Sequence, residues 1–370
     1  MIFLGEDEIA AGTLSVKDLK AGEQVSVSRE NAINIIRTAI DGGVTYMDTA
    51  YVYLDQTSEV ILGKALQDGY RERVTIATKL PTWMVEKEED MQRFFDEELA
   101  RLQTDHIDFY LVHSLSAERW SKIKALGICQ FLDRLKKEGK IRFACFSFHD
   151  DYKAFETILN DYDWDMCQIQ YNFMDINNQA GTKGLELAGS KGIPVVVMEG
   201  LLGGRLAKAP DNVQALYDAF PVKRSPVEWA FRWLCNHPQV ATVLSGLTSV
   251  EQVKDNLRIF DTVEPDCMSK EELELIDKVR DAYNSRIKVG CTGCAYCMPC
   301  PMGVDIPGSF SAWNNASLYG GLEKGNADYK RLEEAGKAPT QCVECGACMQ
   351  VCPQHLEIPE LLKKVTADLK

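Results

Sequence analysis

Residues 44–53 read Val-Thr-Tyr-Met-Asp-Thr-Ala-Tyr-Val-Tyr, a short apolar run that leads directly into an acid and two phenols. Similar short apolar runs recur along the first three quarters of the chain, at residues 8–14, 44–47, 74–77, 107–112, 141–146, 166–169, 195–198 and 241–244. The charged segments between them place apolar residues three and four apart, as amphipathic helices do, most clearly at 29–41, 87–102, 128–138 and 250–260. Eight strand–helix repeats favour an α/β fold of the (β/α)8 TIM-barrel type over an open doubly wound sheet.

Polar side chains follow three neighbouring runs where the strands are expected to end. Asp48 and Tyr53 follow the run at 44–47, Lys79 follows the run at 74–77, and His113 follows the run at 107–112. In such barrels the carboxyl ends of the strands form one face, and this face carries the active site. We therefore expect an acid, a phenol, an amine and an imidazole to meet at the rim of one barrel.

This combination of side chains suits the protonation of a carbonyl oxygen. A phenol has a pKa near 10, and a neighbouring ammonium group lowers that value. A carboxylate keeps the ammonium group charged and oriented, and an imidazole orients a carbonyl oxygen or shares in proton transfer. Each of the four residues alone has an ordinary structural explanation, and Tyr51 is a rival phenol to Tyr53. Their positions at successive strand ends favour catalysis.

The motifs around these residues resemble those of the aldo-keto reductase family from residue 9 to about residue 284. They are Asp48-Thr49-Ala50-x-x-Tyr53, Ser58-Glu59-x-x-Leu62-Gly63-x-Ala65-Leu66, Ala77-Thr78-Lys79, Arg101-Leu102-Gln103-x-Asp105-x-Ile107-Asp108 and Leu111-Val112-His113. The resemblance implies that Tyr53 is the proton donor, assisted by Asp48, Lys79 and His113. It also implies a nicotinamide cofactor, NAD(P)H, and a small-molecule carbonyl or alcohol substrate.

The resemblance carries the cofactor contacts over only in part. The matching residues are Gly12, Thr13, Ser147, Gln168 and Asn256. Phe148 stands where the family usually has an asparagine, and Met198 where an aromatic residue commonly stacks on the nicotinamide. Gly246 and Gln252 stand where many NADPH-using members have basic residues, so we predict that NADPH is not strongly preferred.

Eight of the 13 cysteines form two tight groups near the C-terminus. The groups are Cys291-x-x-Cys294-x-x-Cys297-x-x-Cys300-Pro301 and Cys342-x-x-Cys345-x-x-Cys348-x-x-x-Cys352-Pro353. The second has the bacterial ferredoxin spacing, in which the fourth cysteine binds the other cluster. Zinc is the alternative metal, but two groups of four that each end in Cys-Pro favour two 4Fe-4S clusters.

We therefore expect two domains, an aldo-keto-reductase-like barrel over 1–285 and a small, mostly helical, ferredoxin-like iron–sulfur domain over 286–370. By analogy with ferredoxins, Cys352 joins the first group in binding one cluster and Cys300 joins the second group in binding the other; uncrossed ligation remains an alternative. A glycine-rich linker is expected at 319–326. Only about eight residues precede the first expected strand, so the N-terminal β-hairpin usual in the family is either missing or cut short.

Charge and hydropathy exclude several classes of partner. The formal net charge of −14 argues against nucleic acid and anionic lipid. No apolar run is long enough to cross a membrane, and the acidic N-terminus does not resemble a signal peptide, which together predict a cytoplasmic protein.

Three functional hypotheses remain open. The chain is an enzyme whose clusters exchange electrons with a ferredoxin- or flavodoxin-like carrier, an electron-transfer protein whose barrel is a binding platform, or a reductase with purely structural clusters. The four rim residues count against the second hypothesis. A nicotinamide gives two electrons as hydride whereas a cluster takes one at a time, and no flavin motif is evident; this counts against a direct relay between the two.

Overall fold

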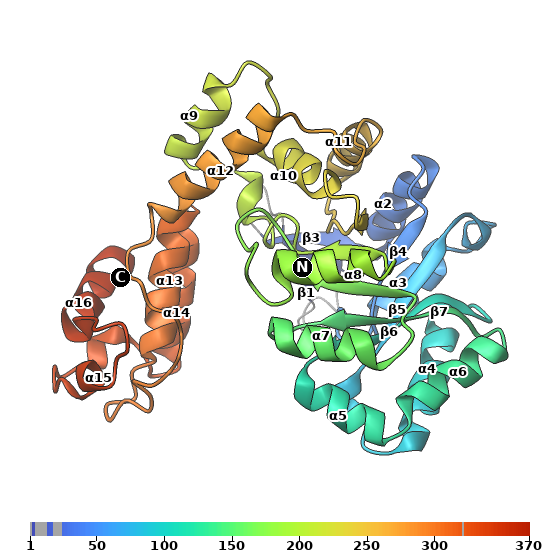
Figure 1. The fold of residues 1–370 in the computed structure, drawn as a ribbon, viewed down its shortest axis with the longest axis horizontal. Helices are drawn as coiled ribbons and strands as arrows, with labels where there is room; N and C mark the ends of the chain where they lie inside the picture. The colour runs from blue at the N-terminus through green and yellow to red at the C-terminus, as the bar shows by residue number, and fades with distance from the viewer. Residues whose placement is uncertain (1, 4–12, 18–23, 320–321) are drawn as a thin grey trace. The chain divides into compact units, whose positions relative to one another are not determined.

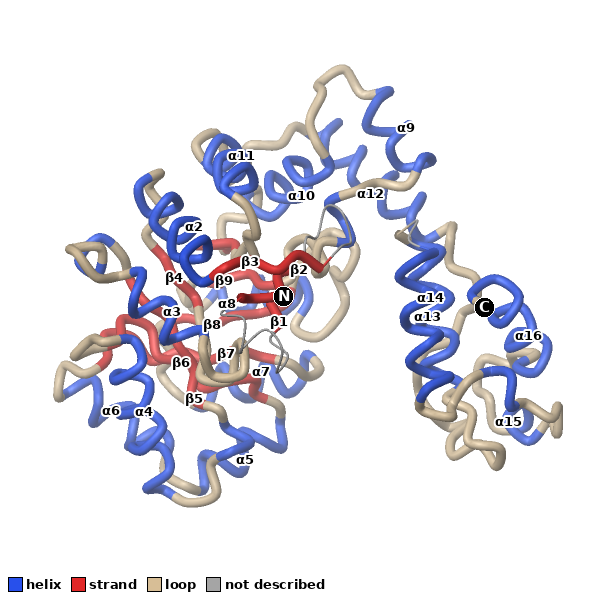
Figure 2. The backbone as a smooth tube through the Cα atoms, turned by 180° about the vertical axis from the view of Figure 1, so that it is seen from behind, coloured by secondary structure: helices blue, strands red, loops and turns tan. Residues whose placement is uncertain are grey.

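The computed structural model describes residues 2–3, 13–17, 24–319 and 322–370 (Figures 1 and 2). It contains two compact units. The first, here called the barrel unit, comprises residues 1–204 and 227–270; the second, here called the cysteine unit, comprises residues 205–226 and 271–370. The boundary near residue 285 remains a prediction from the sequence.

The barrel unit is built on a curled sheet of seven parallel strands, seen in red in Figure 2. The strands pair in chain order: β4 (Tyr46–Asp48), β5 (Thr75–Leu80), β6 (Ile107–Leu115), β7 (Ile141–Phe148), β8 (Met166–Gln170), β9 (Val195–Met198) and β10 (Val240–Val243). Each lies on an apolar run identified in the sequence. Consecutive parallel pairing with helical crossovers is the arrangement of a (β/α)8 barrel, so the expected fold class is confirmed.

The N-terminal segment differs from the expectation. Residues 8–12 of the first expected strand lie outside the described residues, and Thr13 and Leu14 belong to an antiparallel strand, not to the parallel sheet. Strands β1 (Ile2–Phe3), β2 (Thr13–Lys17) and β3 (Gln24–Ser28) form a separate antiparallel sheet in which β2 pairs with both neighbours. An antiparallel β2–β3 pair is thus present near the N-terminus, where we expected the hairpin to be missing or cut short.

Helices connect the strands and cover the outside of the sheet (Figure 1). They are α2 (Arg29–Asp41), α3 (Ser58–Ala65), α4 (Glu88–Leu102), α5 (Ala117–Ala125), α6 (Ile128–Lys137), α7 (Tyr152–Asp161), α8 (Gly181–Ser190), α10 (Pro226–Cys235) and α11 (Val250–Phe260). The four helices predicted from periodicity match α2, α4, α6 and α11 to within a residue. Side-chain caps fix where several begin; for example, Asp151 accepts a hydrogen bond of 2.9 Å from the amide of Ala154 at the start of α7.

Inward-facing side chains of five adjacent strands fill the centre of the barrel unit. They are Ala77, Leu111, Cys145, Met166 and Val196, all buried and in mutual contact. Small residues alternate with larger ones across this layer, so the centre is a packed core and the chemistry is left to the rim.

The cysteine unit is helical. Its helices are α9 (Asp211–Ala219), α12 (Lys270–Asn284), α13 (Ile306–Leu318), α14 (Leu322–Glu334), α15 (Ala347–Gln350) and α16 (Ile358–Leu369). The predicted glycine-rich linker at 319–326 is wrong in its second half, because α14 already begins at Leu322. In the described part of the chain, no helix is long and apolar enough to span a membrane.

A compact apolar core joins α13, α14 and α16 in this unit. Phe310, Trp313, Tyr329, Leu362 and Val365 are among its buried members, and six of the eight grouped cysteines pack against it. The Trp313 indole donates a 2.7 Å hydrogen bond to Asp368, which ties α13 to α16.

Candidate active site

The parallel register brings the predicted rim residues to one end of the sheet. Asp48 pairs with Ala77, and Lys79 pairs with Leu111, two residues before His113. Asp48, Lys79 and His113 therefore point to the same side of the sheet, each two residues further along its strand than the one before. Tyr53 follows β4 in the turn that leads to α3.

Lys79 is the centre of the group. Its side chain is 1% exposed, and its Nζ lies 2.5 Å from Asp48 Oδ1 and 2.6 Å from the carbonyl oxygen of Thr49. The same nitrogen lies 5.0 Å from the centroid of the Tyr53 ring. Burial by itself lowers the pKa of Lys79, but Asp48 and Tyr53 outweigh burial and raise it above its usual value. A buried, permanently charged ammonium group therefore lies against the phenol.

His113 completes the group from β6. Its ring meets the Tyr53 ring edge to face, with 5.8 Å between the centroids. Burial, together with the charge of Lys79, holds the pKa of His113 well below its usual range, so the imidazole is neutral. Tyr53 is 39% exposed, which leaves the phenol accessible from the solvent side.

The rival phenol, Tyr51, has a structural role. It is buried, and its hydroxyl donates a 2.5 Å hydrogen bond to Glu97 on α4. The Arg101 guanidinium lies 4.0 Å from the centroid of its ring. Of the two phenols, only Tyr53 therefore lies with Lys79 and His113.

Two buried acids lie behind the rim, between the sheet and its helices. Glu59 on α3 accepts a 2.6 Å hydrogen bond from Thr78, the residue before Lys79, and pairs with Arg101 at 3.3 Å. Glu98 on α4 is fully buried beside it, and burial together with the charge of Glu59 raises the pKa of Glu98 well above its usual value. A second layer of polar groups thus supports the strand that carries Lys79.

A strip of exposed apolar side chains borders His113 on the other side. Trp83 is 41% exposed, and its ring lies 5.1 Å from that of His113. Met84 is exposed next to it. The backbone of His113 is held in place by Thr82, whose hydroxyl donates 2.8 Å to the His113 carbonyl. Trp83 thus borders the rim group and offers an apolar wall beside it.

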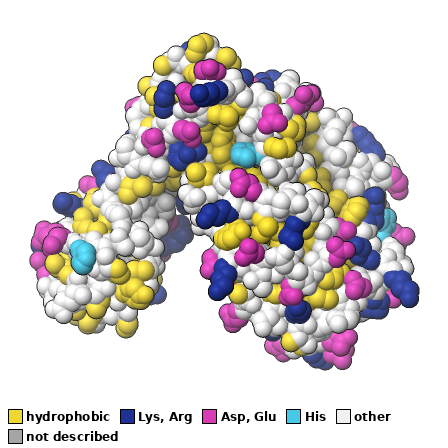
Figure 3. Space-filling view, in the orientation of Figure 1, with side chains coloured by type: hydrophobic (Ala, Val, Ile, Leu, Met, Phe, Trp, Pro, Cys, Tyr) yellow, Lys and Arg dark blue, Asp and Glu magenta, His cyan; other side chains and the backbone are white. Residues whose placement is uncertain are grey.

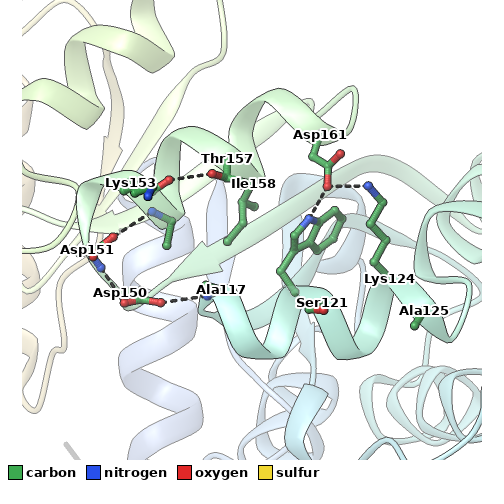
Figure 4. A pocket seen from close by; sticks show the side chains of 12 residues that line it. Ala117, Ser121, Lys124, Ala125, Asp150, Asp151, Lys153, Thr157, Ile158 and Asp161 are labelled. Carbon is green, nitrogen blue, oxygen red and sulfur yellow. Dashed lines mark hydrogen bonds and ion pairs between the residues drawn. The ribbon is translucent and has the colours of Figure 1, made fainter.

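Trp120, a tryptophan on α5, does not border the rim group. It is 4% exposed, packs on Trp164, and donates a 2.7 Å hydrogen bond from its indole to Asp161. This contact lines an open groove of about 790 Å³ between α5 and α7, where Lys124 also pairs with Asp161 at 2.6 Å (Figure 4). Trp120 therefore belongs to the packing between two outer helices.

Two of the predicted cofactor contacts lie side by side on neighbouring strands. Ser147 on β7 pairs in register with Gln168 on β8, and both side chains are buried. The Ser147 hydroxyl accepts a 2.8 Å hydrogen bond from the amide of Ser114, next to His113. The Gln168 amide nitrogen contacts the Met198 sulfur at 3.8 Å, while its Oε1 is buried and has no partner among the described residues. A buried acceptor without a donor is costly unless a ligand satisfies it.

The remaining predicted contacts are less informative. Gly12 lies outside the described residues, and Thr13 is described only as the first residue of β2. Asn256 on α11 donates a 2.9 Å hydrogen bond to the Ser245 hydroxyl. Phe148, at the usual asparagine position, is buried against Phe155 and offers no polar group.

The cysteines of the two sequence groups are interleaved around two cavities. One cavity is lined by Cys291, Cys294, Cys297 and Cys352, and the other by Cys300, Cys342, Cys345 and Cys348, with Cys297 shared between the two. The fourth cysteine of each sequence group therefore lies with the opposite group. In the described residues, no three His, Cys, Asp or Glu side chains gather closely enough to hold a single metal ion.

The two cavities differ in what surrounds them. Four large apolar side chains around the second cavity are exposed, namely Tyr296, Met302, Val343 and Val351. None of the residues that line the first cavity is among the large exposed apolar residues of the described chain. Figure 3 shows apolar side chains gathered on the visible face of this unit. We call Tyr296, Met302, Val343 and Val351 the apolar ring.

Comparison with known families accounts for both units. The model of the Aldo/keto reductase family matches residues 8–281. The chain belongs to the aldo/keto reductase family. A second family model, for a 4Fe-4S dicluster domain, matches residues 290–356. The protein is thus an NAD(P)-dependent oxidoreductase of the aldo-keto reductase type with a C-terminal 4Fe-4S domain, as the motifs predicted.

Two relatives with similar sequences are named as reductases. Methylglyoxal reductase YeaE of Escherichia coli is 26% identical over 271 residues, which cover 70% of this chain and 88% of the relative. NADH-specific methylglyoxal reductase of the same organism is 28% identical over 276 residues, which cover 62% and 83%.

Solved structures agree at the level of the barrel. The holo form of an aldo-keto reductase from Bacillus halodurans has a TM-score of 0.57 and 26% identity, covering 70% of this chain and 92% of that one. An aldo/keto reductase from Klebsiella pneumoniae in complex with NADP and acetate has a TM-score of 0.56 and 26% identity, covering 68% and 86%.

One rim residue of this aldo-keto reductase had not been foreseen. Arg119, in the first turn of α5, lies with its guanidinium 5.1 Å from the centroid of the Trp83 ring. Its Nη1 donates 2.8 Å to the Ser114 carbonyl and 2.6 Å to the Ser114 hydroxyl. The sequence shows only an arginine six residues after His113, and no pattern in a single sequence separates it from other helix-surface cations.

Proposed function

We propose that the chain exchanges hydride between a nicotinamide cofactor and a carbonyl or alcohol substrate, with Tyr53 as proton donor. One observation carries this proposal: the buried Lys79 ammonium lies against both the Asp48 carboxylate and the Tyr53 ring. An ammonium group so placed favours the charged form of the phenol that remains after proton donation.

Each member of the group has a separate task. Asp48 and the carbonyl of Thr49 hold the Lys79 ammonium in place. His113, neutral and next to Tyr53, offers an uncharged hydrogen-bonding group to the carbonyl oxygen. Tyr53 then donates its proton to that oxygen in reduction and takes it back in oxidation. When bound, the nicotinamide supplies or accepts the hydride.

The residues on β7 and β8 suit the carboxamide of a nicotinamide. The unpartnered Gln168 Oε1 can accept a hydrogen bond from the carboxamide nitrogen, and the Ser147 hydroxyl can donate to its oxygen. Gly12, Thr13 and Asn256 remain proposed contacts by family resemblance.

The test is activity of the anaerobically purified, full-length protein on a panel of aldehydes, ketones and alcohols with NADH and NADPH. We expect turnover of at least one carbonyl compound by wild type and a large loss in Tyr53→Phe. If no carbonyl or alcohol is turned over with either nucleotide, the barrel is a binding platform and the proposal fails.

For residues 286–370 of the cysteine unit, we propose two 4Fe-4S clusters with crossed ligation. At least four thiols line each cavity, and four is the number of donors that a cubane cluster requires. Cys352 then serves with Cys291, Cys294 and Cys297, and Cys300 serves with the other three. Anaerobic protein should contain about eight irons and matching sulfide, from two clusters of four. Zinc without acid-labile sulfide would refute the iron–sulfur assignment.

We further propose that the second cluster exchanges electrons with a ferredoxin- or flavodoxin-like carrier. The apolar ring around its cavity supports this, because transient redox partners dock through small apolar patches. Purely structural clusters do not need such a ring. Val343→Lys should slow carrier-dependent cluster reduction, followed by EPR, without changing iron content; equal rates in both proteins would favour structural clusters.

Reduced thiols at this density also fit a cytoplasmic location.

A further inference from the structure

Arg119 is placed where a bound substrate would extend away from the catalytic group. Its guanidinium lies 5.1 Å from the Trp83 ring centroid, and the Trp83 ring lies 5.1 Å from that of His113. The exposed face of Trp83 thus connects the neutral imidazole, at which a carbonyl oxygen is expected, with a cation.

The pairing of Arg119 is exceptional. All other arginines of the barrel unit with described side chains form an ion pair with a carboxylate: Arg37, Arg71, Arg73, Arg93, Arg101, Arg134, Arg142, Arg232 and Arg258. Arg119 forms none with the described residues. Its Nη1 is engaged with Ser114, whereas its Nε and Nη2 make no hydrogen bond to a described residue.

In the described part of the chain, no carboxylate forms an ion pair with this guanidinium. Two histidines feel its charge: burial first, and Arg119 in part, lower the pKa of His113 and of His149. Both rings are therefore neutral near pH 7. Glu199 also acts on His149, in the opposite sense, but it does not pair with Arg119 in the described structure. The Asp48 carboxylate is bound to Lys79.

We propose that Arg119 binds a carboxylate on the substrate, so that the substrates are short carbonyl compounds with a terminal carboxylate. This rests on the hydride exchange proposed above. A planar guanidinium with free N–H groups matches a carboxylate in shape and charge. A substrate chain of about four to six C–C bonds, each ~1.5 Å long, is long enough to reach past Trp83 from the catalytic group to Arg119.

A purely structural role for Arg119 makes a different prediction. Ser114 has a φ of +54°, in the left-handed region, and Arg119 holds it there directly after His113. If this brace were its whole task, removing Arg119 would disturb His113 and slow every substrate alike. Recognition of a carboxylate affects charged substrates selectively.

The experiment compares 4-oxobutanoate with its uncharged methyl ester. In wild type and in Arg119→Met, Arg119→Lys and Lys122→Met, kcat/KM is measured for both compounds with the preferred nucleotide. Lys122 is an exposed cation on the same helix, so Lys122→Met removes the same charge elsewhere. We expect Arg119→Met to lower the acid-to-ester ratio by about 10- to 100-fold, the scale of a hydrogen bond between charged groups. Arg119→Lys should recover part of the ratio, and Lys122→Met should leave it within about 2-fold.

A second readout does not depend on turnover. Butanoate, which cannot be reduced, should bind holoenzyme more tightly than butanamide in calorimetry, and Arg119→Met should remove the difference. An unchanged acid-to-ester ratio with both rates lowered would overturn the proposal in favour of the structural brace. If wild type reduces neither compound but turns over an uncharged carbonyl compound of the panel, the proposed substrate class is wrong. If it turns over no carbonyl compound at all, the proposed hydride exchange is at fault, and butanoate binding still decides the role of Arg119.

Discussion

The barrel rim and the cysteine unit achieve order in opposite ways. At the rim, the folded chain pairs its buried charges internally: Lys79 is buried in contact with Asp48, and Glu59 is bonded to Thr78 and Arg101. In the cysteine unit, the eight grouped cysteines line two cavities, and Cys294 and Cys345 are exposed. The buried ion pairs of the rim form without a ligand, whereas the cysteine unit brings together groups that stabilise the fold only when they bind metal.

The two regions therefore differ in what organises them: the folded chain preorganises the rim, whereas the cysteine unit depends on metal. A parallel sheet buries enough apolar surface to position an ion pair before any cofactor arrives. Within residues 286–370 of the cysteine unit, a small core lies between α13, α14 and α16, and most of the grouped cysteines pack on it. Small domains of this kind usually need a metal or disulfides to supplement their cores.

The largest expected effect is therefore that of iron removal. Chelation under anaerobic conditions should open the cysteine unit while the barrel unit stays folded. In hydrogen exchange, we expect amides of α16 (Ile358–Leu369) to exchange at least ~100-fold faster and those of β6 (Ile107–Leu115) to keep their protection.

Matched cysteine variants show whether the clusters cause this effect. Cys348→Ser removes a proposed ligand, whereas Cys129→Ser removes a cysteine from outside both groups. Only the first should reproduce the opening of α16. If the protection of α16 is unchanged after complete iron loss, both units stay folded without metal, and the contrast drawn between them is wrong.

The next effect is on catalysis. Tyr53→Phe removes the proposed proton donor without disturbing the Asp48–Lys79 pair, so carbonyl reduction should fall by about 100-fold or more. Tyr51→Phe removes a hydroxyl bonded to Glu97 and should cost about 1 kcal/mol of stability with little change in kcat. Steady-state kinetics and thermal unfolding of both variants test this, and equal losses of activity would mean that the proton donor is misassigned.

The sequence predicted the fold because local patterns agreed with the tertiary structure. Apolar runs such as 141–146 and the periodic segment 250–260 became β7 and α11 nearly residue for residue. The antiparallel β2–β3 pair was missed because Thr13–Lys17 and Gln24–Ser28 are short and lack a turn signal of the usual kind. The start of α14 was missed because two glycines, which here precede the helix, are read as a linker.

The sequence predicted only those site residues that belong to recognisable motifs. Strand-end positions placed Lys79 and His113 correctly on adjacent strands, because parallel register follows chain order. The proximity of Trp83 and Arg119 depends on how the turn after β5 packs against the first turn of α5, which no spacing encodes. For the same reason, Trp83 and Trp120 could not be told apart from the sequence.

A smaller effect concerns the choice of nucleotide. The charges of the barrel unit are largely paired internally, and Arg258 follows this rule by pairing with Glu228 at 2.8 Å and with Asp255 at 3.0 Å. Gln252 is likewise engaged, because its Oε1 accepts hydrogen bonds from Thr248. We therefore expect NADPH to show no strong advantage over NADH.

The measurement is kcat/KM for the two nucleotides at equal ionic strength. A preference for NADPH of more than about 100-fold, or roughly 2.7 kcal/mol, would contradict this expectation. Glu228→Gln sharpens the test, because it frees Arg258 from one carboxylate and should shift the ratio toward NADPH by a few fold if that arginine can reach the 2′-phosphate.

The last expected effect concerns the pH dependence of stability, and it tests how dry the polar layer behind the rim is. Burial, and the charge of Glu59, raise the pKa of Glu98 well above its usual value, so the folded state holds a proton that the unfolded state releases. The stability from this group is thus fully present below the unfolded pKa near 4.5 and is lost as pH rises towards the folded pKa, by up to about 1.4 kcal/mol per pH unit. Glu98→Gln keeps the shape of the protonated side chain but cannot ionise. It should therefore match wild type near pH 4.5 and become the more stable protein as pH rises, in urea unfolding of the barrel unit monitored from pH 5 to pH 8. Parallel pH profiles for the two proteins would show that Glu98 ionises without cost, and that the polar layer behind Lys79 is less dry than its burial indicates.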